Sequence, residues 1–305
     1  MKTRGALTDK IFDSMLSNES KKISEKVTLS IAIASYLIHL VLIFLVQQQI
    51  IDLDSKFFKN PIAAIYTPFS FVLIYEVYLL IFFLPKSISS YIGKQYEIIT
   101  LIVIRRIFKD LSQLELSSDW FTIKNDLQFT YDVLSSLLLF FFIYLFYAMI
   151  KRRKTENELD EKSPEKASIK KFIELKKGIA SFLVPILIGL GVYTFYNWTY
   201  AIITNYENGG TSFSDINDVF FDEFFTVLIV VDVLLLLASF YYSDKFHKII
   251  RNSGFAISTI LIKISFTVDG IVNNALILSA VLFGILVLFI HNKFEIDLQK
   301  VALND

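Results

Sequence analysis

The chain has 305 residues, of which 54% are hydrophobic and 15% aromatic, and its 30 basic and 30 acidic residues cancel to a net charge of zero. This apolar content is too high for an ordinary soluble domain, so the composition predicts an integral membrane protein. The chain has no cysteine, which excludes disulfides, thiolate metal sites and thiol catalysis. The abundance of Ile, Phe, Lys and Asn is typical of AT-rich bacterial coding, which favours a bacterial inner (cytoplasmic) membrane.

Apolar segments divide the chain in a regular way. A bilayer core of about 30 Å needs about 20 apolar residues per helix. The sequence therefore predicts an all-α, polytopic membrane protein with about eight transmembrane helices. They fall at 27–47, 61–84, 95–111, 128–150, 178–204, 223–243, 254–271 and 273–291. The polar residues 1–26 contain no signal-peptide pattern and are expected to form a cytoplasmic N-terminal segment.

The two halves of the chain carry similar charges at similar places. The apolar run 72–80 contains one carboxylate, Glu76, and the run 228–236 contains one carboxylate, Asp232. We interpret residues 27–150 and 178–291 as tandem four-helix repeats. Because each repeat has an even number of spans, both would face the same way, related by an axis along the membrane normal.

Cations follow each carboxylate at a matching distance. Arg105 and Arg106 lie in the first half, and Lys263 lies in the second. A charge at membrane depth costs about 2.5–3.5 kcal/mol on insertion scales and usually serves a function or has a partner. The spacing predicts that Glu76 meets Arg105 or Arg106, and that Asp232 meets Lys263.

The distribution of Lys and Arg predicts the orientation. The charged linker 151–177 holds ten of them, and 23 of the 30 fall on one side of the predicted membrane. By the positive-inside rule this side is the cytoplasm, so the linker, the tail 292–305 and both termini are expected there.

Other polar residues predict less. His39 is single in the first span and is expected to make a polar helix contact; in a water-filled path it would also handle protons. No cofactor motif, metal-ligand spacing or nucleophile signature is present, so we expect no enzyme, cofactor or metal site, and no nucleic-acid binding. Small residues at 32, 34 and 35 and at 189 and 191 allow a homo-oligomer, although they could equally pack within one chain.

Two functional hypotheses follow. In the first, the chain is a transport protein or channel that moves an ion, proton or small solute past Glu76, Arg105, Arg106, Asp232, Lys263 and His39. In the second, it is a membrane-embedded interaction protein, such as a scaffold, a sensor or an effector in stress or phage defence. Its charge pairs would then be structural.

Overall fold

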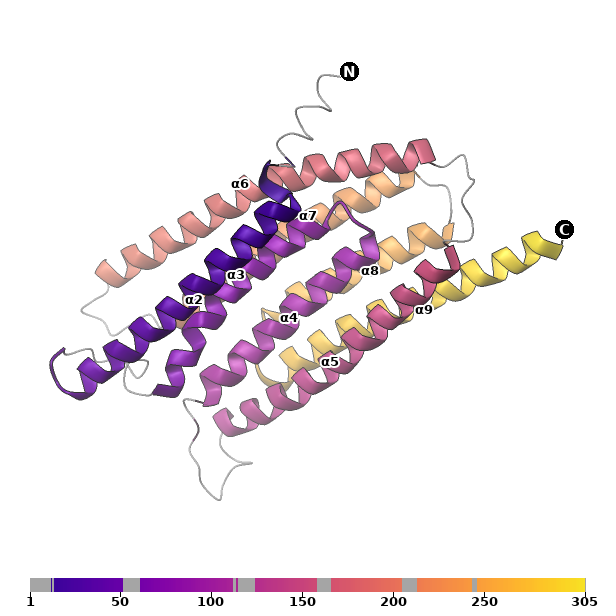
Figure 1. Cartoon of the computed structure of the whole chain (residues 1–305). Coiled ribbons are helices and arrows are strands. Elements are labelled where there is room, and N and C mark those ends of the chain that lie inside the picture. The colour runs from indigo at the N-terminus through magenta and orange to yellow at the C-terminus, as the bar shows by residue number, and fades with distance from the viewer. Residues whose placement is uncertain are drawn as a thin grey trace.

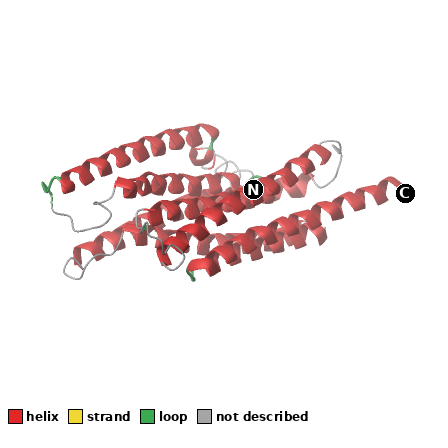
Figure 2. Ribbon diagram, turned by 90° about the horizontal axis from the view of Figure 1, so that it is seen from below, coloured by secondary structure: helices red, strands yellow, loops and turns green. Residues whose placement is uncertain are grey.

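The computed structural model describes residue 12 and residues 14–51, 61–111, 114, 124–157, 166–204, 213–242 and 246–304. Within these residues all regular structure is helical and no strand occurs, which confirms the all-α class (Figure 2). The short 3₁₀ helix η2 (Pro61–Ile65) accompanies eight long α-helices. These are α2 (Asn18–Gln47), α3 (Tyr66–Phe83), α4 (Ile88–Leu111), α5 (Lys124–Asn157), α6 (Lys166–Thr204), α7 (Phe213–Tyr242), α8 (Phe246–Ser265) and α9 (Gly270–Asn304).

Five of the described helices are long and apolar enough to cross a membrane. These stretches are Asn18–Gln47 of α2, Asp126–Lys151 of α5, Lys170–Tyr193 of α6, Glu223–Tyr242 of α7 and Gly270–Leu298 of α9. Helix α3 contributes a shorter apolar stretch, Thr67–Phe83. Helices α4 and α8 carry more polar residues and fall outside this set.

The surface of the bundle is apolar where that of a soluble protein would be polar. In α2 the buried side chains are Ala32, His39 and Ile43, whereas Ile33 and Ile38 are each 60% exposed. Large contiguous apolar surfaces are rare on soluble monomers and are typical of membrane contact. The burial pattern therefore agrees with the composition in indicating a membrane protein.

Within each half of the chain, helices that follow one another pack side by side (Figure 1). In the first half α2 contacts α3, α3 contacts α4, and α4 contacts α5. In the second half α6 contacts α7, α7 contacts α8, and α8 contacts α9. The two series meet mainly where α5 packs on α9, with smaller contacts of α4 on α8 and of α3 on α6. Figure 1 shows α4 and α8 in the middle of the bundle, with α5 and α9 along one side and α6 along the other.

Helix α4 is the most enclosed of the described helices. Its buried side chains lie on every side of the helix. The apolar ones include Ile92, Ile98, Ile99, Ile102 and Val103, and those with polar groups include Tyr91, Gln95, Tyr96, Thr100 and Arg105. A helix that is buried all round has no lipid-facing stripe and can carry polar side chains, provided that they find partners.

Several helix boundaries differ from the predicted ones. Helix α2 begins at Asn18 instead of residue 27, because the side chain of Ser17 caps it by accepting a hydrogen bond from the Ser20 backbone N–H at 3.0 Å. Helix α8 ends at Ser265 instead of residue 271. The chain then turns into Gly270, whose φ of 69° favours glycine, and α9 begins there.

The linker and tail are also more helical than predicted. Helix α5 continues through Asn157, and α6 begins at Lys166, so helix occupies much of the segment predicted as a linker. Helix α9 extends to Asn304, so the segment predicted as a tail continues the last helix.

Candidate functional site

One turn of α4 reaches four other helices. Consecutive helical side chains diverge by about 100°, so four adjacent residues point to all sides of the helix. Lys94 faces α3, Gln95 faces α7 and α8, Tyr96 faces α8, and Glu97 faces α5. This polar turn is therefore a junction of the bundle.

Asp232 of α7 lies on one side of this turn and is only 7% exposed. The Gln95 amide Nε2 donates to Asp232 Oδ2 at 3.1 Å, and Thr259 Oγ1 donates to Gln95 Oε1 at 2.7 Å. The Tyr91 hydroxyl lies close enough to interact electrostatically with Asp232, yet this buried group forms no hydrogen bond within the described residues. All polar neighbours of the Asp232 carboxyl in the described part of the chain are thus neutral.

The structure does not bring the predicted pair of Asp232 and Lys263 together. Asp232 takes its hydrogen bond from Gln95 of α4, because α4 lies against both α7 and α8 at this depth. Lys263 is half-buried in the last turn of α8. Matched spacing in the sequence did not imply contact, since contact also depends on how each helix is rotated about its axis.

Tyr96 continues the junction toward α9. Its hydroxyl is hydrogen-bonded to Ser258 Oγ at 2.8 Å, and Ser258 Oγ donates to the Ala280 carbonyl at 2.7 Å. Both Tyr96 and Ser258 are fully buried. A chain of hydroxyl contacts thus joins α4, α8 and α9.

Glu76 meets a different cation from the predicted one. Lys94 Nζ lies 4.0 Å from Glu76 Oε2 and forms a closer ion pair with Glu97. The Tyr147 hydroxyl of α5 donates to Glu97 Oε1 at 2.5 Å. Glu76 therefore belongs to a group with Lys94, Glu97 and Tyr147, in which Glu97 keeps 28% of its side chain exposed.

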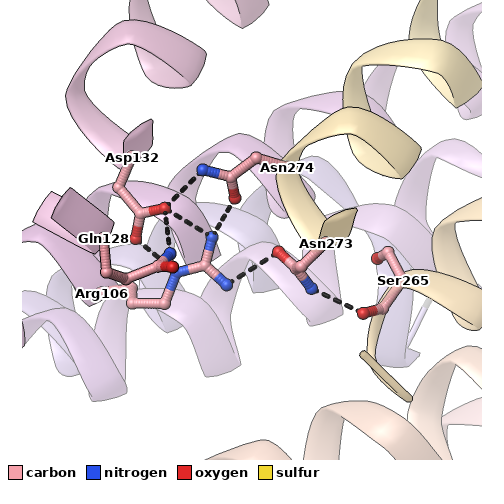
Figure 3. Close-up of polar contacts among 6 residues, drawn as sticks. All are labelled: Arg106, Gln128, Asp132, Ser265, Asn273 and Asn274. Atoms are coloured by element: carbon pink, nitrogen blue, oxygen red, sulfur yellow. Dashed lines mark hydrogen bonds and ion pairs between the residues drawn. The ribbon is translucent and has the colours of Figure 1, made fainter. Parts of the chain in front are cut away.

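A second polar cluster surrounds Arg106 (Figure 3). Arg106 pairs with Asp132 of α5 through one edge of the guanidinium: Nε contacts Oδ2, and Nη2 donates to Oδ1 at 2.8 Å. Gln128 Nε2 also donates to Asp132 Oδ1 at 2.8 Å. Asp132 has no exposed surface, and this bidentate arrangement is the strong form of the Arg–carboxylate bond.

Two amides of α9 complete this cluster (Figure 3). Arg106 donates to Asn273 Oδ1 at 2.8 Å and to Asn274 Oδ1 at 2.5 Å. Asn274 Nδ2 donates in turn to Asp132 Oδ1 at 2.7 Å, and Asn273 Nδ2 donates to the Ser265 carbonyl at 2.6 Å. Arg106 therefore links α4 and α5 of the first half to α9 of the second.

The remaining predicted residues lie apart from these groups. Arg105 is 3% exposed on a different side of α4 from Arg106. His39 Nδ1 is hydrogen-bonded to Thr67 Oγ1 at 2.6 Å, a polar contact between α2 and α3. Within the described residues, no group of three His, Asp or Glu side chains is placed to hold a metal ion.

Several site residues were missed from the sequence. Gln95, Thr259, Asn273 and Asn274 are uncharged, so the pattern of charges within apolar runs did not predict them. The adjacent amides at 273 and 274 near the start of an apolar run were the one available signal, because amides in apolar helices usually find partners on neighbouring helices.

Comparison with protein-family models, with curated proteins and with solved structures gave no match to this chain.

Proposed function

We propose that this chain is a membrane transport protein or channel that moves an ion, proton or small solute past polar groups gathered around α4. The observation that carries the proposal is Asp232. It is a carboxyl buried in the middle of an apolar helix, and its neighbours among the described residues are neutral.

A buried carboxyl that serves only to hold helices together is normally paired with a cation, as Asp132 is with Arg106. Asp232 lacks that compensation among the described residues, so its charged form is costly. Binding a proton or cation from outside would remove the cost. The buried Tyr91 hydroxyl beside it, which forms no hydrogen bond within the described residues, supports this view, because such groups often mark water, an ion or a functional role.

The topology proposed with this function has eight spans in two tandem repeats of the same orientation. Two features support it: consecutive helices pack in the same order in both halves, and α4 and α8 lie in the interior, where a less apolar span is tolerated. The concentration of Lys and Arg in 151–177 supports cytoplasmic termini in a bacterial inner membrane.

A second candidate is a membrane-embedded interaction protein. The Arg106 cluster favours it, because its charges are paired and hydrogen-bonded inside the bundle, as expected of groups that only fix helix packing. This candidate predicts a folded bundle that conducts nothing.

The test is flux through the purified protein in liposomes, with protons, alkali cations, halides and small solutes offered separately. We expect the wild type to conduct one of these, and Asp232→Asn to abolish that flux while the protein remains monodisperse. Asp297→Asn is the matched control, because it removes an exposed carboxyl from the end of α9. No flux by the wild type in any arm, or full flux by Asp232→Asn, would contradict the proposal.

A further inference from the structure

The carboxyl of Asp232 is held by an amide that is itself held by a hydroxyl. Asp232 Oδ2 accepts a hydrogen bond from Gln95 Nε2 at 3.1 Å, and Gln95 Oε1 accepts one from Thr259 Oγ1 at 2.7 Å. Gln95 has no exposed surface, and Thr259 is 1% exposed. In this arrangement an N–H donor faces the carboxyl, which suits its ionised form.

The Thr259 hydroxyl has a second acceptor within reach. Its Oγ1 lies 3.2 Å from the carbonyl oxygen of Phe255, one turn earlier in α8. A hydroxyl carries a single proton, so it makes its main hydrogen bond to one of these acceptors at a time. When it donates to Phe255, its own oxygen is available to accept a hydrogen bond from Gln95.

These contacts allow a second arrangement, which suits a protonated Asp232. Half a turn of the Gln95 amide exchanges its oxygen and its nitrogen. The protonated carboxyl then donates to Gln95 Oε1, Gln95 Nε2 donates to Thr259 Oγ1, and the Thr259 hydroxyl donates to the Phe255 carbonyl. A buried polar group without a partner is costly, and here the same atoms supply partners in both states of the carboxyl.

Two tyrosines of α4 are the titratable neighbours of Asp232, since the hydroxyls of Tyr91 and Tyr96 interact electrostatically with it. The Tyr96 hydroxyl is already bonded to Ser258, whose proton goes to a backbone carbonyl. Tyr91 is 1% exposed and forms no hydrogen bond within the described residues, so its hydroxyl is available to donate to the carboxyl in either state. Within the described residues, no charged side chain of the helices packed on α7 lies close enough to act on the Asp232 carboxyl.

A proton fits this site better than a larger ion does. It lies within a hydrogen bond that is already present and needs no further space. A hard cation such as Ca²⁺ takes about six to eight oxygen ligands at about 2.3–2.6 Å. At Asp232 an N–H donor faces Oδ2, and the described residues bring no second carboxylate to it.

We propose that Asp232 takes up and releases a proton through the two arrangements of Gln95 and Thr259, and that the proton is the species that this chain moves. The inference rests on the proposed function and narrows its substrate from an ion, proton or small solute to the proton. Gln95 and Thr259 are positioning residues, because they act on the proton through Asp232.

Infrared difference spectroscopy tests proton binding separately from transport. The full-length protein in lipid is compared at acidic and alkaline pH, and the carbonyl stretch of protonated carboxylic acids is followed. We expect a band that appears at acidic pH in the wild type and is missing in Asp232→Asn. If Asp232→Asn removes a band that is present at every pH, or removes no band at all, the carboxyl does not exchange its proton and the inference is overturned.

Flux through the wild type in liposomes tests which species moves. Protons, alkali cations, halides and small solutes are offered separately, and we expect protons to move. Movement of one of the other species without protons would overturn this inference and leave the proposed function in place. Absence of any flux would contradict the proposed function and with it proton transport, while the infrared band would still report whether Asp232 binds a proton.

Thr259→Val and Thr259→Ser test the two arrangements at constant charge, and they decide the question if Asp232→Asn does not fold. Valine has the shape of threonine without its hydroxyl, so we expect proton flux to fall about tenfold, as for the loss of one hydrogen bond, and serine to restore it. Thr267→Val is the matched control, because Thr267 is exposed and donates to the Ile264 carbonyl at 2.8 Å. Unchanged flux in Thr259→Val, or equal impairment by valine and serine, would overturn the role of the Thr259 hydroxyl.

Discussion

Asp132 and Asp232 are both buried in this bundle, but their hydrogen-bond partners differ in charge. Asp132 is fully buried and accepts hydrogen bonds from Arg106, Gln128 and Asn274, so its charge is compensated. Asp232 is almost as buried, but its hydrogen-bond partner is the neutral Gln95. The first arrangement suits a fixed contact, whereas the second suits a group that gains and loses a charge.

Removal of one member of the Arg106–Asp132 pair is expected to destabilise the bundle. Arg106→Met would leave the Asp132 carboxylate buried without its cation, and losses of about 3–5 kcal/mol are usual for such changes. The double variant Arg106→Met with Asp132→Leu is expected to be more stable than the sum of the single losses predicts, because no buried charge remains. Thermal unfolding in detergent measures the single variants Arg106→Met and Asp132→Leu and the double variant.

Lys300→Met serves as the control for this cycle, since it removes an exposed cation of α9 and should leave the unfolding temperature unchanged. Additive losses in the double variant would show that Arg106 and Asp132 do not stabilise each other. In either case, flux that survives the double variant would place this cluster outside the transport path.

The sequence could identify the charged members of these groups but not their partners. Asp232 and Arg106 are visible because each interrupts an apolar run. Their contacts depend on the rotation of each helix and on which helices are neighbours, and neither property is local. Asn273 and Asn274 carry no charge, so the charge pattern of the sequence did not predict their contact with Arg106. Both nevertheless accept hydrogen bonds from its guanidinium.

At the scale of elements, α4 explains how polar residues can occupy the middle of an apolar bundle. Its side chains reach polar partners on four neighbouring helices. One of them, Tyr96, also lies over Gly284 of α9: a Cβ added at Gly284 would lie 1.7 Å from the Tyr96 hydroxyl oxygen. The contact between α4 and α9 therefore requires glycine at position 284.

Gly284→Ala is accordingly expected to destabilise the protein by about 1–3 kcal/mol, the usual cost of overpacking. Tyr96 cannot move away freely, because it is fully buried and hydrogen-bonded to Ser258. Gly189→Ala is the matched control, since nothing lies within 4 Å of a Cβ added there. Its effect should be neutral or slightly stabilising, because alanine favours helix.

The midpoint of heat-induced loss of the monodisperse peak in size-exclusion chromatography compares the two glycine variants. Equal midpoints for Gly284→Ala and the wild type would show that α4 and α9 are farther apart than the structure places them. A drop with Gly189→Ala would show that this face of α6 is covered, for instance by a second copy of the chain.

Helix positions were easier to predict than helix ends. Apolar runs locate each helix because the 20-residue requirement is physical, and all eight predicted spans overlap a described helix. Hydropathy does not show where a helix ends once it has left the apolar region. The apolar pattern therefore predicted neither the extension of α2 by the Ser17 cap nor the shortening of α8 by the turn before Gly270.

For the whole molecule, the orientation of the chain depends on which helices cross the membrane. Five helices qualify by length and composition, while α3, α4 and α8 are proposed as spans on the strength of packing and charge. If α4 did not cross, the helices after it would reverse, and the basic linker 151–177 would move to the outer side. That arrangement violates the positive-inside rule. The interior position of α4 and the charge distribution therefore both favour a membrane crossing by α4.

Because the chain has no cysteine, single cysteines can map this topology directly. Ser87→Cys lies just before α4, and Ser117→Cys lies beyond its end, at a residue outside the described part of the chain. A membrane-impermeant maleimide applied to intact spheroplasts should label position 117, whereas position 87 should react only in inverted vesicles.

Ser163→Cys and Gly209→Cys, which flank α6, provide the control, because α6 already qualifies as a span and should separate them in the same way. Labelling of positions 87 and 117 from the same side, with positions 163 and 209 on opposite sides, would remove α4 from the membrane crossings. The repeat of four spans would then fail, while Asp232 on α7 would keep its place in a span.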